Sequence, residues 1–510
     1  MLNHDVLLRI FDFYRLDDEE NWNAQFKWCK LSHVCREWRY LIYQSVFHLD
    51  MHILFTNGTP SLDMLSHLPP LPLVIDYRGN VDDDHSILHA IQHSDRILHI
   101  ILRAPSSSLD RLAVSMGESF PRLETLSLLS TTKSNEGTSV TLPTTFLAPN
   151  LRHLSLRGIF LPKGLPLLAS TFFLVTLRLT DIQSDGYFTP EILVTQLQHI
   201  PHLEGLSIGF STPLPRPGGE ADVLRAPITL RTLPALRWLS FRGVSVYLEG
   251  LIARIASPRL ERFKITLFNQ LNFILPHLSH FTRTTETLRD PVVNVIFSRE
   301  DVSFVAGSRD GFDEGPFSLR IRCKPFDWQL DSAMQICGAL VPVLSVAEEL
   351  TLKFDDESLP PNGQDAIDAM VWHGLLWPFN GVKKLRIGHP LAWELSNVLE
   401  AETEDAGLVL GLLPQLQELE AQVEFRHLDK AFATFVDARR VAGHSVVSLS
   451  VSPVVISTTA SSPSIPTPDA GEHNPPVMVL PPAPGRRNWF RTAIVEPVRR
   501  RFRTRARDGG

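Results

Sequence analysis

A short pattern of apolar residues recurs through the middle of the 510-residue chain. Each copy has an apolar residue, two others, an apolar residue, one other and a closing apolar residue. The ten copies begin at Ile97, Leu123, Leu151, Leu174, Leu203, Leu236, Leu260, Ala347, Val382 and Leu416. The alternation at the end of each copy is typical of a short strand, because successive strand side chains point to opposite faces. The pattern therefore predicts ten strands, each with one buried face.

The segments between these strands have apolar residues at helical spacing, for example over residues 191–199 and 248–255. A proline often precedes the next copy, where it ends a helix and lets a strand begin. Most copies start 23 to 35 residues apart, but one gap of 87 residues has room for two degenerate copies, for which Val293-Val295 and Leu319-Ile321 are the candidates. We therefore expect repeating strand–helix units. A doubly wound sheet is the alternative.

These units resemble an irregular leucine-rich repeat array. The resemblance implies an α/β solenoid over residues 70–440, with strands on a concave face and helices on a convex one. The alternate strand residues would then face the concave surface, where nine basic residues stand against three acidic ones. We expect this face to capture an acidic or phosphorylated segment of a protein substrate. The candidate substrate-binding residues are Arg157, Arg178, Arg242, Arg262, Lys264, Lys384 and Arg386. A solvated scatter of basic residues is the alternative.

The first 48 residues have a different pattern, which predicts two or three short helices. Val6, Leu7, Ile10, Phe11 and Tyr14 recur at intervals of three and four and fall on one helical stripe. Trp28, Leu31, Cys35 and Trp38 repeat this spacing.

The ending Val34-Cys35-Arg36-Glu37-Trp38, followed by Leu41-Ile42, resembles the F-box family. The resemblance implies that residues 1–48 bind a Skp-type adaptor, which links the chain to a cullin complex, while the rest of the chain binds a protein substrate that the sequence does not name. The residues that it assigns to adaptor binding are Leu2, Val6, Leu7, Ile10, Phe11, Val34, Cys35, Trp38, Leu41 and Ile42. The alternative is a set of amphipathic helices that caps a larger domain.

Composition indicates the compartment and the kinds of partner to expect for this protein. No run approaches the roughly 18 apolar residues of a membrane span, and four cysteines without a C-x-x-C pair indicate a reducing compartment. We therefore expect a cytoplasmic or nuclear protein without a nucleic-acid partner. Residues 445–510 are rich in Ser, Thr and Pro and are predicted to be disordered. Their last 25 residues hold nine arginines against two acidic residues, a local +7 on a chain of net charge −7.

Two motifs resemble chemical sites. Gly205-Leu206-Ser207-Ile208-Gly209 matches the G-x-S-x-G motif, but Leu206 and Ile208 belong to a repeat copy, and no strand-to-helix turn is expected at Ser207. His85, His89 and His93 lie four residues apart on one helical face, but no third-ligand motif accompanies them. We therefore expect no catalysis, no cofactor and no metal.

Two functions are consistent with these patterns. The first is the substrate-recognition subunit of a Skp–cullin–F-box ubiquitin ligase. The second is a leucine-rich-repeat-like interaction scaffold without a role in ubiquitin transfer. Adaptor binding separates the two.

Overall fold

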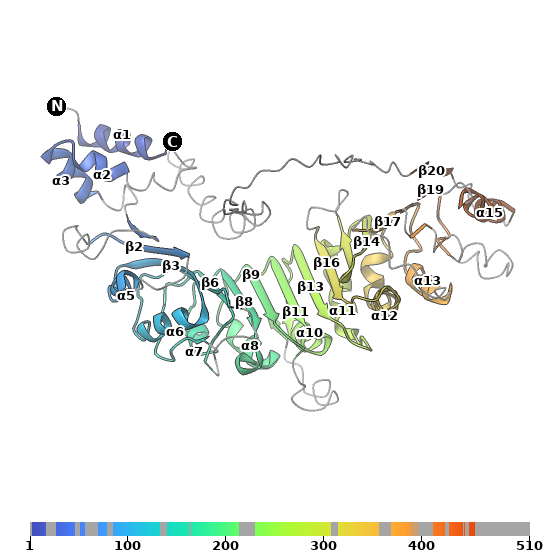
Figure 1. Cartoon of the computed structure of the whole chain (residues 1–510), viewed down its shortest axis with the longest axis horizontal. Coiled ribbons are helices and arrows are strands. Elements are labelled where there is room, and N and C mark those ends of the chain that lie inside the picture. Colours follow the sequence, from blue (N-terminus) through green and yellow to red (C-terminus); the bar gives the residue numbers. More distant parts are fainter. Residues whose placement is uncertain are drawn as a thin grey trace, which may run out of the picture. The chain divides into compact units, whose positions relative to one another are not determined.

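The protein is a mixed α/β molecule built on one large, mostly parallel sheet (Figure 1). The computed structural model describes residues 3–16, 27–45, 52–56, 70–78, 85–132, 140–162, 165–213, 230–307, 315–355, 369–388, 391–392, 395, 412–423, 428–441, 443 and 448–453.

Within these ranges the chain forms twelve α-helices and two short 3₁₀ turns, at Ser184–Gly186 and Glu286–Leu288. The α-helices are α1 (His4–Leu16), α2 (Lys27–Ser32), α3 (Arg36–Gln44), α5 (His85–Ile91), α6 (Ser106–Ser115), α7 (Pro166–Ser170), α8 (Pro190–Leu197), α10 (Ser245–Ile252), α11 (Pro276–Thr284), α12 (Phe326–Leu344), α13 (Ala369–Leu376) and α15 (Leu428–Val441).

Sixteen strands form the large sheet, in the order β1-β2-β3-β4-β6-β8-β9-β11-β13-β16-β15-β14-β17-β18-β19-β20. They are β1 (Ile53–Phe55), β2 (Leu73–Arg78), β3 (Ile97–Ala104), β4 (Thr125–Ser130), β6 (His153–Arg157), β8 (Thr176–Ile182), β9 (Gly205–Phe210), β11 (Trp238–Gly243), β13 (Arg262–Phe268), β14 (Val292–Phe297), β15 (Asp301–Ala306), β16 (Phe317–Arg322), β17 (Glu349–Phe354), β18 (Lys384–Ile387), β19 (Glu418–Val423) and β20 (Ser448–Pro453). Two small parallel pairs join β5 (Val140–Thr141) to β7 (Ile159–Phe160) and β10 (Arg231–Thr232) to β12 (Ile255–Ala256).

All ten predicted strands belong to this sheet, and the three apolar positions of every copy are buried. Neighbouring strands pair in register, so that Leu126, Leu154, Leu177 and Leu206 form one buried row across β4, β6, β8 and β9. Burial of one face explains the sequence pattern, because a strand with one buried face needs an apolar residue at every second position.

The sheet departs from repeating strand–helix units in the gap of 87 residues. The two candidate copies there are indeed strands, β14 and β16, but β15 joins them as an antiparallel partner of both. Strand β16 then pairs with β13, and β14 pairs with β17. The prediction of a strand plus a helix for each copy is therefore wrong at this place, where the chain forms a three-stranded antiparallel meander.

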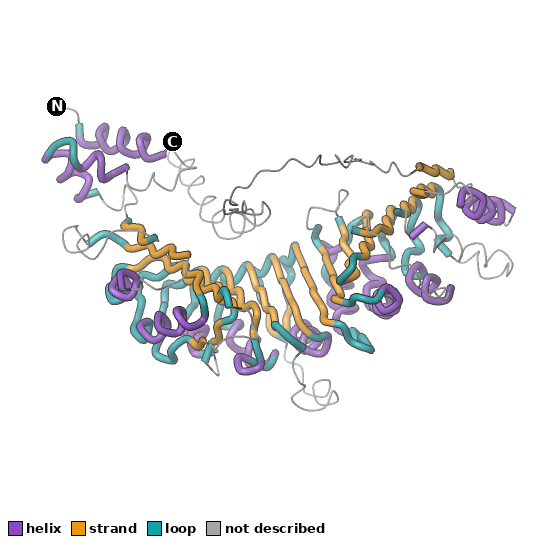
Figure 2. Tube along the Cα trace, in the orientation of Figure 1, coloured by secondary structure: helices purple, strands orange, loops and turns teal. Residues whose placement is uncertain are grey.

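The helices that follow the strands lie along one face of the sheet (Figure 2). Successive helices contact one another, as α8 does with α10, α10 with α11, α11 with α12 and α12 with α13. The apolar strand positions face these helices and form the core. We call the opposite face of the sheet, which carries the alternate strand residues, the polar face.

The sheet extends beyond the predicted bounds at both ends. Strand β1 lies before residue 70, and β20 lies within residues 445–510, which were predicted to be disordered. The prediction is wrong for Ser448–Pro453, because this segment pairs in parallel with β19. The remainder of the predicted tail, from residue 454, lies outside the described residues.

A buried carboxylate links two neighbouring helices. Glu249 of α10 accepts hydrogen bonds from the backbone nitrogens of His277, at 2.7 Å, and Leu278, at 2.9 Å. Both donors belong to the first turn of α11, which has no side-chain cap of its own. Burial raises the pKa of the Glu249 carboxyl from 4.5 to about 7. The cap therefore consists of a group that ionises near neutral pH.

We expect Glu249→Gln to reduce the pH dependence of stability, because the amide keeps an acceptor and does not ionise. Since the folded-state pKa is raised, the stability that goes with the protonated carboxyl is fully present below about pH 4.5 and is lost as the pH rises towards 7. The free energy of unfolding lost over this pH range amounts to about 3 kcal/mol at most. Urea unfolding at pH 5 and pH 8 measures it, with the exposed Glu348→Gln as control. Equal losses in Glu249→Gln and the unmutated protein would contradict this role.

Candidate protein-binding surfaces

The first candidate surface lies on the head, which we define as helices α1, α2 and α3. Helix α1 is capped by Asn3, whose side-chain oxygen accepts a hydrogen bond from the backbone nitrogen of Asp5 at 3.3 Å. Helix α3 is capped by Cys35, whose sulfur accepts a hydrogen bond from the backbone nitrogen of Trp38 at 3.4 Å. Both side chains therefore fix the points at which the helices begin.

Four apolar side chains of the head are buried. Leu7 and Phe11 of α1 are buried, as are Leu41 and Ile42 of α3. The rings of Phe11 and Trp38 meet edge to face, with their centroids 4.8 Å apart. Four of the ten residues assigned to adaptor binding are thus core residues, which support the surface and do not form it.

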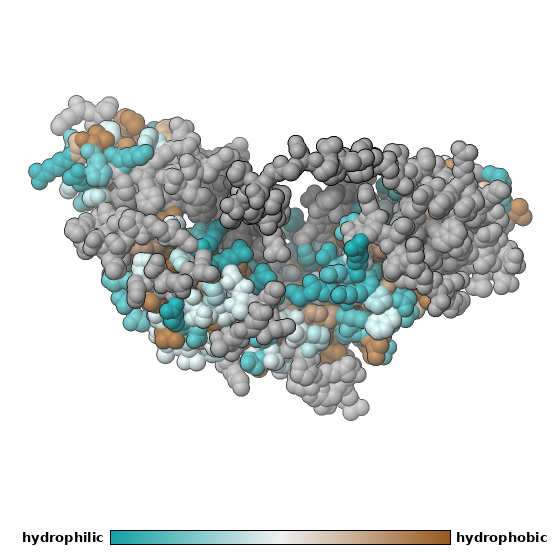
Figure 3. Space-filling model, viewed as in Figure 1, coloured by the Kyte–Doolittle hydropathy of each residue, from teal (hydrophilic) through white to brown (hydrophobic). Residues whose placement is uncertain are grey.

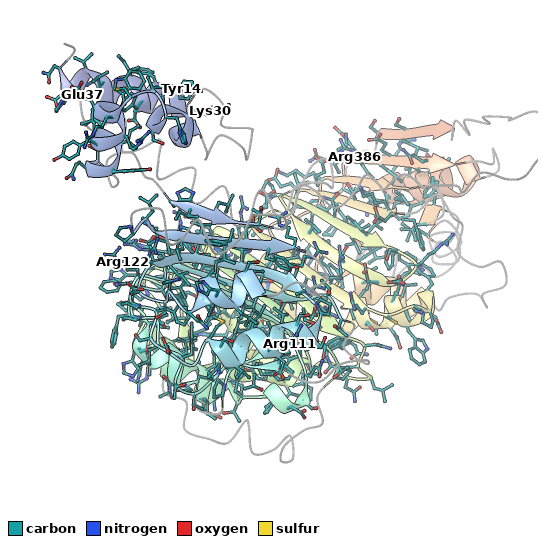
Figure 4. The ribbon with its side chains drawn as sticks, turned by 60° about the vertical axis from the view of Figure 1, so that its left-hand side comes forward. Tyr14, Lys30, Glu37, Arg111, Arg122 and Arg386 are labelled. Carbon is teal, nitrogen blue, oxygen red and sulfur yellow. The ribbon has the colours of Figure 1, made fainter. Side chains whose placement is uncertain are left out.

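Other apolar residues of the head point outward. Val6 and Ile10 on α1 are each 44% exposed, and Phe13 is 74% exposed. Val34 between α2 and α3 is 60% exposed, and Tyr40 on α3 is 66% exposed. Figure 3 shows apolar surface on the head, and Figure 4 labels Tyr14, which continues the stripe of Val6 and Ile10.

The structure therefore divides the stripe that the sequence analysis placed on one side of α1. Leu7 and Phe11 face inward, whereas Val6, Ile10 and Tyr14 face outward. Sequence reasoning missed Phe13 and Tyr40, although Phe13 follows Ile10 by three residues and completes the outward stripe. Among the remaining predicted residues, Val34 and Cys35 are exposed, Trp38 is half-buried, and Leu2 lies outside the described residues.

The second candidate surface is the polar face of the sheet. At its middle, Asp181 of β8 lies between two arginines: Arg157 of β6 at 2.5 Å and Arg242 of β11 at 3.4 Å. Asp181 has a φ of 55°, and the register of β8 shifts at this point in a bulge. Thr180 and Asp181 therefore both stand between the buried Leu179 and Ile182.

Next to this cluster, an arginine and a tryptophan stack. The guanidinium of Arg178 on β8 lies over the indole ring of Trp238 on β11, 4.8 Å from its centroid. The same indole covers Gly205 of β9, where a Cβ atom would come within 2.0 Å of it. Gly205 is therefore glycine because the ring lies against the backbone, which explains the first glycine of the G-x-S-x-G motif.

The C-terminal part of the polar face is different, because its charges are paired internally. Arg386 of β18 contacts Glu349 of β17 and lies 3.1 Å from Glu420 of β19. Lys384 lies 2.8 Å from Glu418 and 3.8 Å from Glu420. Figure 4 labels Arg386 on this part of the sheet. The predicted substrate-binding residues thus fall into two groups. One lies in the middle of the polar face, and the other consists of Lys384 and Arg386, whose charges are neutralised by neighbouring glutamates.

The other predicted residues of this face lie on β13, where Arg262 is exposed and Lys264 is half-buried. Sequence reasoning missed Asp181 and Trp238. It missed Asp181 because strict alternation places this residue on the buried face, and the bulge reverses that placement.

The two chemical motifs form no such clusters. Ser207 lies in the middle of β9, which continues to Phe210, so the turn that exposes a nucleophilic serine is not present there. The rings of His89 and His93 meet edge to face, with centroids 5.3 Å apart, and α5 ends before His93. Nowhere in the described ranges do three or more His, Cys, Asp or Glu side chains group as metal ligands would.

None of the helices within the described ranges has the length and apolar character needed to cross a bilayer. No protein-family model matches the chain, and no curated protein matches its sequence.

Proposed function

We propose that this chain is the substrate-recognition subunit of a Skp–cullin–F-box ubiquitin ligase. In this proposal the head is an F-box that binds a Skp-type adaptor, and the polar face of the sheet binds the protein substrate. The chain itself performs no chemistry. The observation that carries the proposal is the outward apolar stripe of Val6, Ile10, Phe13 and Tyr14, which stays exposed while Leu7 and Phe11 of the same helix are buried. Exposed apolar residues that gather on one face mark a protein-binding site.

The arrangement of the sheet supports the second half of the proposal. Strands β2 to β13 follow one another in chain order, and each pair of neighbours is parallel. Helices cover only one face of these strands (Figure 2). This is the arrangement expected of a leucine-rich-repeat-like solenoid, whose concave strand face is the usual place for a protein ligand.

A receptor and a scaffold differ in what happens to the proteins that they bind. We expect proteins captured through the polar face to accumulate when cells carry a chain with Val6 and Ile10 both replaced by Asp, because capture continues while ubiquitin transfer stops. Quantitative mass spectrometry of the captured proteins, with their half-lives, measures this effect. Unchanged half-lives would favour the scaffold. The control is Gln44→Asp, which adds a charge at an exposed polar position of the same head.

A further inference from the structure

The charges of the polar face divide sharply along the sheet. The six adjacent strands β6, β8, β9, β11, β13 and β16 contain seven basic residues and one acidic residue, Asp181, a net charge of +6. Strands β17, β18 and β19 contain three basic and three acidic residues, a net charge of zero. The six middle strands therefore carry an excess of positive charge that β17 to β19 lack, although Asp301 of the neighbouring β15 lies 3.7 Å from Arg320 of β16. Figure 3 shows hydrophilic surface in the middle of the sheet.

Arg242 at the centre of these strands is incompletely satisfied. Arg242 shares its one carboxylate with Arg157, and its Nε atom is buried without a hydrogen-bond partner. Burial and the nearby charges of Arg322 and Arg157 lower the pKa of Arg242, while Asp181 opposes them. A buried guanidinium donor without an acceptor is unfavourable. An added carboxylate beside the partly exposed guanidinium would relieve the repulsion among these arginines.

Strand β9 contributes no long side chain beside these arginines. Between the arginines of β8 and β11 it contributes only Gly205, Ser207 and Gly209 to the polar face. Gly205 is covered by Trp238, and a Cβ on Gly209 would be in ordinary contact with Arg242 and Thr180, at 3.6 Å or more. Gly205 and Gly209 are buried beneath these neighbours, and Ser207 is the partly exposed residue of β9 between the two pairs of side chains that cross the strand.

We propose that strands β6 to β16 bind an extended, carboxylate-rich segment of a protein, with Arg157, Arg178 and Arg242 as its central ligands. Asp181 is an internal carboxylate that occupies part of this site. The inference deepens the proposed function and rests on it for the role of the bound segment, which would be the substrate. Neighbouring strands lie about 4.8 Å apart, so the six strands span roughly 24 Å, about the length of seven extended residues.

The spread of the charges favours several carboxylates over one phosphate group. The seven basic residues lie on five of the six strands. A single dianionic group at the Arg157–Arg242 cluster would not extend across all five of these strands. Aspartates at alternate positions of an extended segment repeat about every 7 Å, so about three carboxylates fall within the roughly 24 Å that the six strands span.

The test uses the full-length chain and a fluorescent twelve-residue peptide of alternating Asp and Thr. Its neutral counterpart alternates Asn and Thr, and a third peptide carries one phosphoserine among Asn and Thr. We expect fluorescence anisotropy at about 50 mM salt to show binding of the Asp peptide that weakens as salt screens the charges. The two other peptides should bind at least tenfold more weakly.

Two sets of variants locate the site. The pair Arg157→Gln and Arg242→Gln should weaken binding of the Asp peptide about tenfold or more, whereas Asp181→Asn should strengthen it several-fold by releasing both arginines. The matched control is the pair Arg237→Gln and Lys383→Gln, which removes the same charge from exposed ion pairs outside the six strands. Thermal unfolding checks that each variant folds. If the variant with both arginines replaced fails to fold, the affinity of Asp181→Asn for the Asp peptide alone decides whether the inference stands.

Three results would overturn the inference: equal binding of the Asp and Asn peptides, tighter binding of the phosphoserine peptide, or no gain in Asp181→Asn. These experiments can overturn this inference and the proposed function independently of each other. Adaptor binding without binding of the Asp peptide would overturn only this inference. Binding of the Asp peptide by a chain that does not bind the adaptor would overturn only the ligase role.

Discussion

Replacing Val6 and Ile10 together by Asp will abolish adaptor binding and leave the head folded. Both side chains are half-exposed on the outward stripe of α1, so the substitutions place two charges where they can reach water. In the complex these carboxylates would be buried without partners, which costs several kcal/mol. We therefore expect the dissociation constant to rise at least about 100-fold. Calorimetric titration with a purified Skp-type adaptor measures this change.

The controls for this experiment come from the same helices. Gln44→Asp adds a charge at an exposed polar position of α3 and should leave the affinity unchanged. Phe11→Ala removes a buried ring that packs on Trp38, and it should lower hydrogen-exchange protection in both α1 and α3. The Val6 and Ile10 variant should keep that protection. Undiminished adaptor binding by this variant would remove the outward stripe from the interface.

Phe263→Ala should be the most destabilising single change among those considered in the sheet. Phe263 of β13 is buried, and its ring lies 5.5 Å from that of Phe281 on α11 and 6.2 Å from that of Phe317 on β16. It therefore joins β13, a covering helix and β16, the last strand of the antiparallel meander. Removing a buried phenyl ring costs about 3 to 5 kcal/mol. Urea unfolding followed by circular dichroism measures the loss.

Two matched substitutions distinguish the cost of the cavity left by Phe263→Ala from other effects on the free energy of unfolding. Phe263→Leu keeps most of the volume and should cost about 1 to 1.5 kcal/mol. Phe173→Ala removes the same ring from a half-exposed position and should change the free energy of unfolding by about 0.5 kcal/mol or less. A loss below about 1 kcal/mol for Phe263→Ala would mean that this ring is not a central part of the core.

The sequence predicted the strands well because burial imposes their pattern. Leu123, Leu126 and Leu128 are apolar since each faces the core, and a period of two with a fixed spacing can be read without coordinates. Strand β15 was missed, although Val302, Phe304 and Ala306 alternate in the same way. It lacks the leading apolar residue of the repeated pattern, and antiparallel pairing with β14 and β16 is a tertiary outcome.

The site could be predicted only in part, because neighbours across a parallel sheet are distant in sequence. Lys384 and Glu418 are 34 residues apart and form an ion pair only through the register of β18 and β19. A count of basic residues therefore could not distinguish the neutralised end of the polar face from its unbalanced middle. The sequence likewise could not show which residues of the α1 stripe face outward and which face inward. The packing of Phe11 on Trp38 in the structure decides this.

The unmutated arm of the adaptor titration tests the central claim most directly. Full-length protein titrated with the purified Skp-type adaptor should give a saturable one-to-one complex, with heat that disappears when Val6 and Ile10 are replaced by Asp. No measurable binding by the unmutated chain, with α1 and α3 protected from hydrogen exchange, would contradict the assignment of the head as an F-box and the ligase role with it.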